Sequence, residues 1–277
     1  MKGIIKASTF YSQVEKAQHK GQDPGHKIGL PSLDELYRVK LGMMTVVTGI
    51  PGHGKSEIVD DMLVRLSQFH GWRFCFFSPE NYPLEQHYIK IAEKLAREQF
   101  SKFEASDHRV SKEWIQDHFT WLYPDDDNET VNLDWILDRA RFLAESEGLQ
   151  GLVLDPWNEI EHQRGTMSET DYVSLALTKI RRFARRYDVH CWIVAHPTKL
   201  QKDKATGQYP VPTPYDISGS AHWRNKADFC LTVHRPDVTK NMVNVFVQKV
   251  KFKHLGRVGQ CTLNYRWHCG TFAELQP

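Results

Sequence analysis

Long hydrophobic runs are missing from this 277-residue sequence, and no segment approaches the length of a membrane-spanning helix. The first five residues, Met-Lys-Gly-Ile-Ile, lack the apolar core and small-residue cleavage site of an export signal. These absences predict a chain that stays in the cytoplasm or an equivalent compartment and makes no contact with a membrane.

Cysteine is scarce, and its spacing argues against two common uses. The five cysteines are an odd number and no two form a C-x-x-C pair, so neither a disulfide framework nor a zinc site is indicated. An excess of one charge is also missing, because 36 lysines and arginines stand against 34 acidic residues, a formal net charge of +2. That balance is too small to indicate nucleic-acid binding by itself, so such an argument needs local basic patches.

What remains is the composition of an ordinary globular protein, with 40% hydrophobic and 25% charged residues. We expect one compact domain over residues 27–277, since the length is enough for one substantial core. In residues 1–26 a polar, helix-prone stretch leads into the turn-rich Gly-Gln-Asp-Pro-Gly at 21–25. This arm fits either a linker that docks elsewhere, as a piece of a longer polypeptide, or a frayed terminus.

The most informative stretch is residues 49–56, Gly-Ile-Pro-Gly-His-Gly-Lys-Ser, which satisfies the phosphate-binding pattern G-x-x-x-x-G-K-[ST] at every specified position. A β-branched run precedes it and apolar residues at helical spacing follow it, as the motif requires. Backbone N–H groups would curl around a polyphosphate, Lys55 would reach the terminal phosphates and Ser56 would ligate Mg²⁺. The predicted nucleotide contacts in this stretch are Gly49, Pro51, Gly52, His53, Gly54, Lys55, Ser56 and Glu57.

Apolar runs alternate with helical patterns along the chain. This alternation predicts an α/β fold with a doubly wound, mostly parallel twisted sheet, flanked by helices and finished by an antiparallel C-terminal edge. Residues 199–220, rich in Lys, Pro, Gly and Tyr, are expected to form a long functional loop. The expected strands are 44–48, 72–78, 119–123, 151–154, 191–195, 229–233, 243–250 and 260–265, and the expected helices are 31–36, 57–69, 84–100, 111–117, 132–147 and 168–188.

Ligands of open α/β sheets sit at the carboxyl ends of the strands, so the residues that follow each apolar run are candidates for chemistry. Asp155 would hold Mg²⁺ together with Ser56, although a turn aspartate before a proline is an alternative. Glu80 would orient or deprotonate the attacking water, and His196 would sense the γ-phosphate by hydrogen bonding. On spacing alone, a surface glutamate and a structural histidine remain open for these two positions.

Basic residues gather in two places. Lys199, Lys202 and Lys204 lie in the long loop after His196, where they could contact the backbone of single-stranded nucleic acid. The second group crowds the last hairpin, where cations could complete a neighbouring subunit's ATP site. Solvated surface charge is the alternative for both groups. The hairpin group comprises Lys249, Lys251, Lys253, His254 and Arg257.

A series of motifs in a fixed order accompanies the phosphate loop. They are Gly-Leu-Pro-Ser-Leu-Asp at 29–34, Phe-Ser-Pro-Glu-Asn at 77–81, Leu-Val-Leu-Asp-Pro at 152–156, Val-Ala-His-Pro at 194–197, Ser-Gly-Ser-Ala at 218–221, Lys-Ala-Asp at 226–228 and Lys-Val-Lys-Phe at 249–252. On these residues the chain resembles the RecA-like P-loop helicase domain of DnaB-type hexameric helicases. Within that group it most resembles the Twinkle-like and phage primase-helicases, and the resemblance covers residues 27–267.

The resemblance implies an ATP-driven replicative helicase that uses Mg²⁺ and moves 5' to 3' on single-stranded DNA as a ring, usually a hexamer. It supports Glu80 as the catalytic carboxylate, His196 as the γ-phosphate sensor, and the three lysines of the long loop as channel-lining residues. The family presents a K-x-R pair to the neighbouring nucleotide. Here the second position is Lys251, so the trans-acting cation is either this lysine or Arg257.

The resemblance also implies partners and a location. It places the chain in a bacterial or phage-infected cell, or in an equivalent nucleoid compartment. These residues contain no primase signature, so any priming activity would belong to an upstream domain or to a primase partner. The arm at 1–26 would correspond to the linker that packs on an adjacent subunit.

Other activities remain open on the sequence. One is a RecA-like, DNA-dependent ATPase without unwinding activity, such as a recombinase or a ring-forming regulatory ATPase. Another is an assembly module that hydrolyses ATP slowly. A P-loop kinase is disfavoured, because no arginine-rich lid is present. Inside the phosphate loop, His53 occupies a free position of the pattern, and we expect it to face the mouth of the site without a catalytic role.

Overall fold

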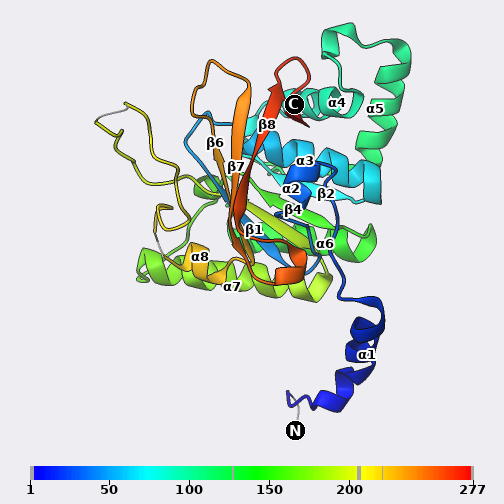
Figure 1. Ribbon diagram of the computed structural model, residues 1–277, viewed down its shortest axis with the longest axis vertical. Helices are drawn as coiled ribbons and strands as arrows, with labels where there is room; N and C mark the ends of the chain where they lie inside the picture. Colours follow the sequence, from blue (N-terminus) through cyan, green and yellow to red (C-terminus); the bar gives the residue numbers. More distant parts are fainter. Residues whose placement is uncertain (1–2, 127, 205–206, 220, 276–277) are drawn as a thin grey trace.

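The computed structural model describes residues 3–126, 128–204, 207–219 and 221–275, so Ser220 of the Ser-Gly-Ser-Ala motif lies outside the described residues. Within these ranges the strands are β1 Met44–Thr48, β2 Phe74–Phe77, β3 Phe119–Trp121, β4 Gly151–Leu154, β5 His190–Val194, β6 Phe229–His234, β7 Met242–Val250, β8 Gly259–Arg266 and β9 Thr271–Glu274. They form one sheet in the order β3-β2-β4-β5-β1-β6-β7-β8-β9 (Figure 1).

The sheet is parallel from β3 across to β6 and antiparallel from β6 to β9. This confirms the predicted α/β fold with a mostly parallel sheet and an antiparallel C-terminal edge. Every residue of β1 is buried, as expected for a β-branched strand between two helical layers. The carboxyl ends of β1, β2, β4, β5 and β6 therefore meet along one edge of the sheet.

Helices cover both faces of the sheet (Figure 1). Their buried side chains form two separate core clusters, one on each face. The first face carries α3 Lys55–His70, α4 Leu84–Ala96 and α5 Ala105–His118, and the second carries α6 Leu133–Ser146, α7 Glu169–Tyr187 and the short α8 His222–Lys226.

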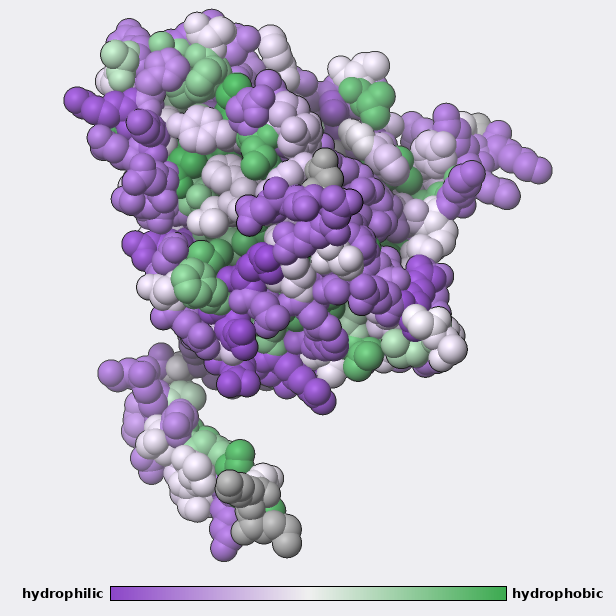
Figure 2. All heavy atoms as spheres, turned by 180° about the vertical axis from the view of Figure 1, so that it is seen from behind, coloured by the Kyte–Doolittle hydropathy of each residue, from purple (hydrophilic) through white to green (hydrophobic). Residues whose placement is uncertain are grey.

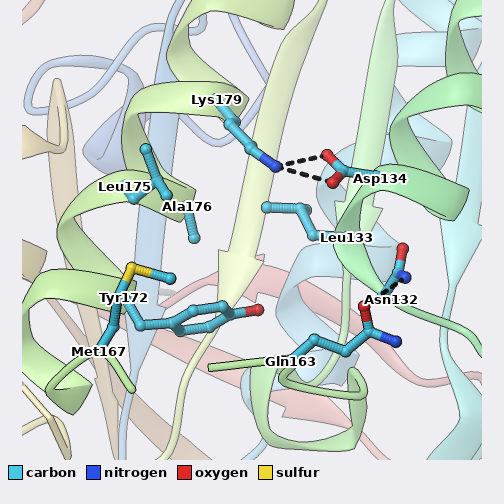
Figure 3. A pocket seen from close by; sticks show the side chains of 9 residues that line it. All are labelled: Asn132, Leu133, Asp134, Gln163, Met167, Tyr172, Leu175, Ala176 and Lys179. Carbon is cyan, nitrogen blue, oxygen red and sulfur yellow. Dashed lines mark hydrogen bonds and ion pairs between the residues drawn. The ribbon is translucent and has the colours of Figure 1, made fainter. Parts of the chain in front are cut away.

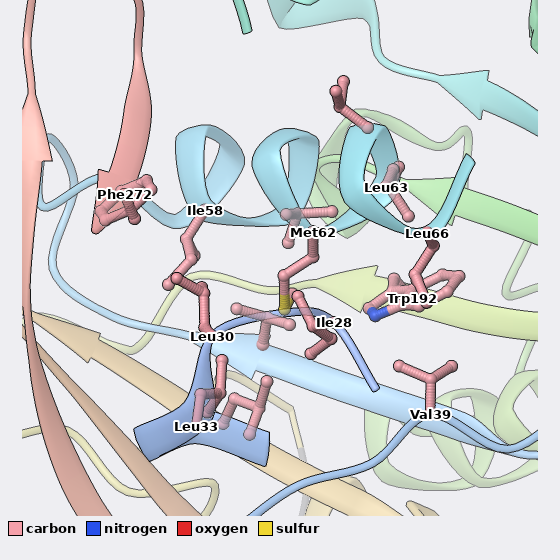
Figure 4. Close-up of a cluster of buried hydrophobic side chains, with 14 of the residues drawn as sticks. Ile28, Leu30, Leu33, Val39, Ile58, Met62, Leu63, Leu66, Trp192 and Phe272 are labelled. Atoms are coloured by element: carbon pink, nitrogen blue, oxygen red, sulfur yellow. The ribbon is translucent and has the colours of Figure 1, made fainter. Parts of the chain in front are cut away.

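The helix that follows the phosphate loop packs into one of the two hydrophobic clusters (Figure 4). Its buried residues Ile58, Met62 and Leu66 recur at i, i+4 and i+8, so they line one face of α3. Ile28, from the chain that leads through α2 (Pro31–Asp34) into β1, and Phe272 of β9 belong to the same cluster. Burial of each such side chain contributes about 1.5–3 kcal/mol, so the phosphate loop is attached to a rigid helix.

The N-terminal arm stands apart from the body of the molecule (Figures 1 and 2). It comprises a short 3₁₀ turn at Ala7–Phe10 and the helix α1 at Tyr11–Lys20, and neither contains a buried residue. Several of its apolar side chains are exposed, which leaves the assignment of residues 1–26 as a docking arm a prediction. They are Ile4, Ile5, Phe10, Tyr11 and Val14.

Some predicted boundaries were wrong. The helix expected at 84–100 ends at Ala96, because Arg97 adopts a left-handed conformation with φ of 58°. The helix expected at 111–117 begins earlier, at Ala105, where Glu104 and Asp107 form a capping box. Strand β9 was missed, since its four residues carry little pattern of their own and are ordered by pairing with β8. No helix among the described residues is long and apolar enough to cross a bilayer.

Candidate active site

The phosphate loop leaves the end of β1 and enters α3. Gly49 passes so close to β6 that an added Cβ would lie 2.3 Å from Val233 O, which explains the need for glycine there. Gly54 begins the helix with φ of 92°. The Lys55 side chain folds back over the loop, and its Nζ donates to Gly49 O at 3.0 Å and to Ile50 O at 3.3 Å. Its ammonium therefore lies inside the loop that a polyphosphate would occupy.

Asp155 and Ser56 meet at the carboxyl end of β4, as the sequence predicted. Asp155 is buried, and its carboxylate accepts a hydrogen bond from the Ser56 side chain. Burial is the main cause that raises the pKa of Asp155 to about 6, while the bond to Ser56 opposes the rise and the carboxylates of Asp60 and Glu80 add to it. Negative charge is therefore concentrated where a hydroxyl and a carboxylate converge, and this donor set suits a magnesium ion.

Glu80 and His196 face each other across the ends of β2 and β5. Glu80 lies in a 3₁₀ turn, Pro79–Asn81, and its side chain is 51% exposed. Its Oε1 is 3.8 Å from His196 Nε2. Burial is the main cause that lowers the pKa of His196, and the Lys55 ammonium lowers it further, whereas Glu80 raises it. The imidazole is consequently held in its neutral form beside a carboxylate that is open to solvent.

One cavity of about 580 Å³ joins Ser56, Glu80 and His196 with Lys55. Burial is also the main cause that lowers the pKa of Lys55 to about 8, although Asp155 and Glu80 oppose this shift. A cavity of this size is within the range of small-molecule sites. Its lining includes Pro51, Gly52, Gly54, Lys55, Ser56, Glu57, Glu80, Asn81, Lys90, Asn158 and His196.

Glu57 lines this cavity but is already paired with two lysines of α4. Its Oε2 lies 2.5 Å from Lys94 Nζ and its Oε1 lies 3.2 Å from Lys90 Nζ. Burial alone would raise the pKa of Glu57, but the two ammonium groups outweigh it and lower the net value. The carboxylate therefore attaches α3 to α4, and a direct contact between Glu57 and nucleotide stays a prediction.

His53 differs from what its free position in the pattern predicted. It does not face the open mouth of the site as filler, because only 6% of the residue is exposed. Its Nδ1 accepts a hydrogen bond of 3.0 Å from the Arg235 N–H, and its ring centroid is 5.2 Å from that of His234. Burial is the main cause that lowers the pKa of His53 to about 4. This histidine fixes the phosphate loop to the end of β6.

The two basic groups lie outside the nucleotide cavity. Lys199, Lys202 and Lys204 are exposed on the long loop, which projects from the body in Figure 1. In the last hairpin, Lys251 Nζ is 2.7 Å from Asp228 Oδ1, and Arg257 Nη2 is 3.6 Å from Glu35 Oε2. Lys202 lines a separate cavity together with His53 of the phosphate loop, but among the described residues none of these cations lines the cavity that contains Lys55.

The sequence analysis did not predict the residues of a second cavity that borders the phosphate loop. A cavity of about 200 Å³ next to Gly52 and Gly54 is lined by Arg235 and Tyr265, and the Arg235 guanidinium is 6.0 Å from the centroid of the Tyr265 ring. Arg235 follows β6 directly, so the strand-end rule could have found it. Tyr265 gives no such signal, because its position depends on the pairing of β7 with β8.

A smaller cavity of about 100 Å³ lies between α6 and α7, remote from these groups (Figure 3). Lys179 Nζ and the Asp134 carboxylate, 2.7 to 2.8 Å apart, close one side of it. Tyr172 and Leu133 supply apolar surface. None of the predicted site residues lines it, and we assign it no chemistry.

A phosphate loop, a strand-end aspartate and a strand-end glutamate in an open α/β sheet define a RecA-like P-loop ATPase domain. Residues 25–274 match the family described as the DnaB-like helicase C-terminal domain, and the chain belongs to this family. The resemblance stated from the sequence motifs is thereby confirmed.

Two relatives bear on the assignment. The chain is 36% identical over 288 residues to the Twinkle homolog protein, chloroplastic/mitochondrial, of Arabidopsis thaliana, covering 98% of this chain and 40% of that protein. It is 23% identical over 260 residues to a probable plasmid replicative DNA helicase of Chlamydia psittaci, covering 90% of this chain and 55% of that protein. The chain thus spans about half the length of these relatives or less.

Solved structures share the fold. The ATPase domain of a phage helicase matches with a TM-score of 0.76 and 18% identity over 100% of both chains. A DnaB-like replicative helicase, studied for its interactions with primase, matches with a TM-score of 0.78 and 17% identity over 99% of this chain and 69% of that one. At these identities the likeness concerns the fold alone.

Proposed function

We propose that this chain is the motor domain of a replicative helicase, which hydrolyses ATP at subunit interfaces of a ring and moves 5' to 3' on single-stranded DNA. The observation that carries the proposal is the convergence of Lys55, Ser56, Glu80 and His196 on one cavity, with Asp155 directly behind Ser56. Membership of the DnaB-like helicase family supports the coupling of this site to DNA unwinding.

Each of the site residues would have a separate role in phosphoryl transfer. Lys55 would exchange its bonds to Gly49 O and Ile50 O for bonds to the terminal phosphates. Ser56 and Asp155 would hold a magnesium ion, which would supply positive charge to the phosphate groups when bound. The residues around Asp155 fit a magnesium ion. Burial and the neighbouring acids Asp60 and Glu80 raise the pKa of Asp155, and a divalent cation would neutralise this excess of negative charge.

Glu80 would position and deprotonate the water that attacks the γ-phosphate. Its carboxylate is half exposed, so it can reach water at the cavity mouth. His196, 3.8 Å away and neutral, can donate or accept a hydrogen bond, and it connects the γ-phosphate position to the long loop that follows β5. The adenine base would lie in the small cavity beside the phosphate loop, against the Tyr265 ring or the Arg235 guanidinium that line it.

Assembly would complete the site. A cation of the last hairpin, Lys251 or Arg257, would act on the nucleotide of the next subunit, since neither reaches the phosphate loop of its own chain. The exposed apolar residues of the arm at 1–26 would pack on a neighbouring copy. A primase, as an upstream domain or a separate partner, is proposed by analogy with the DnaB-like helicase whose interactions with primase were studied.

The test combines one substitution with two substrates. Glu80→Gln should keep ATP binding and lower kcat by roughly 10²-fold or more, because the amide cannot accept the water proton. Glu85→Gln, an exposed glutamate of α4, is the matched control and should hydrolyse at the wild-type rate. Wild-type protein should show ATPase stimulated by single-stranded DNA and should unwind a forked duplex with a 5' tail. Rings that hydrolyse ATP independently of DNA and unwind nothing would instead support a regulatory ATPase.

A further inference from the structure

The turn that carries Glu80 is short. It is a single 3₁₀ turn, Pro79–Asn81, between the end of β2 and the start of α4. Backbone hydrogen bonds close it, one of them from Asn81 N–H to Ser78 O at 3.1 Å. The Glu80 side chain is half exposed, so burial does not fix it. The direction in which Glu80 points therefore depends in part on the side-chain contacts of the residues beside it.

Asn81, the next residue in the chain, uses both ends of its side-chain amide. Its Nδ2 donates to Ser78 Oγ at 2.8 Å, and its Oδ1 accepts from Lys90 Nζ at 3.0 Å. Ser78 is buried directly after β2, so the first bond attaches the amide to the end of that strand. Lys90 belongs to α4, so the second bond attaches it to the helix that follows the turn. The amide is thus held from both sides.

A carboxylate at the start of α3 holds Lys90 in turn. Lys90 Nζ is 3.2 Å from Glu57 Oε1, and Glu57 directly follows Ser56 of the phosphate loop. The other oxygen of Glu57 lies 2.5 Å from the ammonium of the buried Lys94, which fixes the carboxylate in place. Since α3 and α4 pack on the same face of the sheet (Figure 1), these ion pairs join the two helices.

The contacts form one path from the phosphate loop to the turn of Glu80. It runs from Glu57 through Lys90 to Asn81, over the distances of 3.2 Å and 3.0 Å given above. An ammonium group has three N–H donors, so Glu57 and Asn81 engage two of those on Lys90. Lys90 also lines the nucleotide cavity, with 40% of its side chain exposed. It is therefore in place to act on the site either through this path or on the nucleotide directly.

We propose that Lys90 is a positioning residue for ATP hydrolysis: through Asn81 it holds the turn that carries Glu80, and through Glu57 it fixes that turn to the helix of the phosphate loop. The inference rests on the proposed function, because it requires Glu80 to be the residue that activates water. A misplacement of about 1 Å at a reacting group can cost roughly 10²-fold in rate. Loss of Lys90 should therefore slow hydrolysis and leave nucleotide binding intact.

Two measurements on the same variants separate positioning from phosphate binding: steady-state ATPase with saturating oligo-dT, and the affinity for a fluorescent, non-hydrolysable ATP analogue. Lys90→Ala should lower kcat roughly 10- to 100-fold while the affinity changes by less than about twofold. Lys90→Arg should restore most of the rate, because a guanidinium can donate to both Glu57 and Asn81. Lys112→Ala, which removes an exposed lysine of α5, is the matched control and should behave as the wild type.

An unchanged kcat in the Lys90→Ala protein would overturn the inference. A loss of affinity as large as the loss of kcat would also overturn it, since Lys90 would then bind the phosphates itself.

Double variants test whether Lys90 acts through Asn81 and Glu80. Asn81→Ala should lower kcat as Lys90→Ala does, and both changes together should cost no more than either alone. In the Glu80→Gln protein, Lys90→Ala should alter the residual rate by less than about twofold, because no catalytic carboxylate is left to position. Losses that multiply in either pair would overturn the inference. A Glu80→Gln protein that hydrolyses ATP at the wild-type rate would instead overturn the role given to Glu80 in the proposed function.

Discussion

Acid should weaken the centre of the sheet through His190, the first residue of β5. Its Nδ1 is 2.7 Å from Lys40 O and its Nε2 is 2.8 Å from Thr45 Oγ1. Because a carbonyl oxygen only accepts, Nδ1 carries the proton and Nε2 accepts from the Thr45 hydroxyl. That hydroxyl in turn accepts from Tyr37 OH at 2.8 Å. A second proton would turn Nε2 into a donor, so the Thr45 hydroxyl would have to reverse and donate to Tyr37 OH instead.

The size of the effect follows from the pKa. Burial is the main cause that lowers the pKa of His190 to about 4, and the hydrogen bond to Lys40 O opposes it only in part. In the unfolded chain the value returns to about 6.5, so the unfolded state binds the proton first. The contribution of the neutral ring to stability is therefore complete above pH 6.5 and is lost as the pH falls toward 4. Between pH 7.5 and pH 5 the linkage relation gives a loss of about 2 kcal/mol.

Urea denaturation at a series of pH values measures this loss. The comparison is with His190→Asn, whose amide N–H can still donate to Lys40 O but does not titrate. The wild-type free energy of unfolding should fall by about 2 kcal/mol more than that of the variant between pH 7.5 and pH 5. His19→Asn, on the exposed face of α1, is the control and should follow the wild type. Parallel pH profiles for wild type and His190→Asn would refute the reasoning.

Three further outcomes are expected. Gly256→Ala should lower the free energy of unfolding by about 1–3 kcal/mol in urea titrations, because Gly256 has φ of 138° and an added Cβ would lie 2.0 Å from Leu36 O. Changing Lys202 and Lys204 together to alanine should weaken single-stranded DNA binding and reduce its logarithmic salt slope by up to about 1.4; an unchanged slope would mean that both are solvated surface charge. Arg257→Ala should abolish ATPase in assembled rings while the melting temperature stays the same, whereas Lys251→Ala should lower the melting temperature; the reverse pattern would identify Lys251 as the trans cation.

The places of the candidate catalytic side chains could be predicted because their signals are local. The phosphate loop is a contiguous motif, and Glu80, Asp155 and His196 each follow a run of apolar residues that is typical of a buried strand. Parallel strands place such residues at one edge whatever the order of the strands in the sheet. The structure accordingly brings Glu80 and His196 together although they are far apart in the chain.

Features that depend on distant pairing could not be predicted in this way. Tyr265 reaches the phosphate loop because β8 pairs with β7 in one particular register, which the alternating pattern of either strand does not specify. Strand β9 is ordered through Arg65 of α3, whose Nη2 donates to Phe272 O at 2.6 Å. The contact of His53 with Arg235 joins residues that are neighbours only after β6 has docked beside β1. A free position in a motif therefore says nothing about which distant element fills the space beside it.

The two candidates for the cation that acts on the neighbouring subunit differ in the ion pair that each would have to break within its own chain. Lys251 is paired with Asp228, whose side chain is only 1% exposed and whose other oxygen accepts from Met44 N–H at the start of β1. Removing the Lys251 ammonium would leave the buried Asp228 carboxylate with one amide partner. The free energy of unfolding would fall by up to ~3 kcal/mol, an upper value because Lys251 is itself 33% exposed.

Arg257 is 71% exposed and lies 3.6 Å from Glu35, which is about as exposed, so this ion pair contributes about 0–1 kcal/mol to stability. Arg257 can therefore reach toward another subunit without weakening its own fold, and its forked guanidinium suits phosphate oxygens better than a point charge does. By this comparison Lys251 supports the start of β1, and we propose Arg257 as the residue that acts on the neighbouring nucleotide.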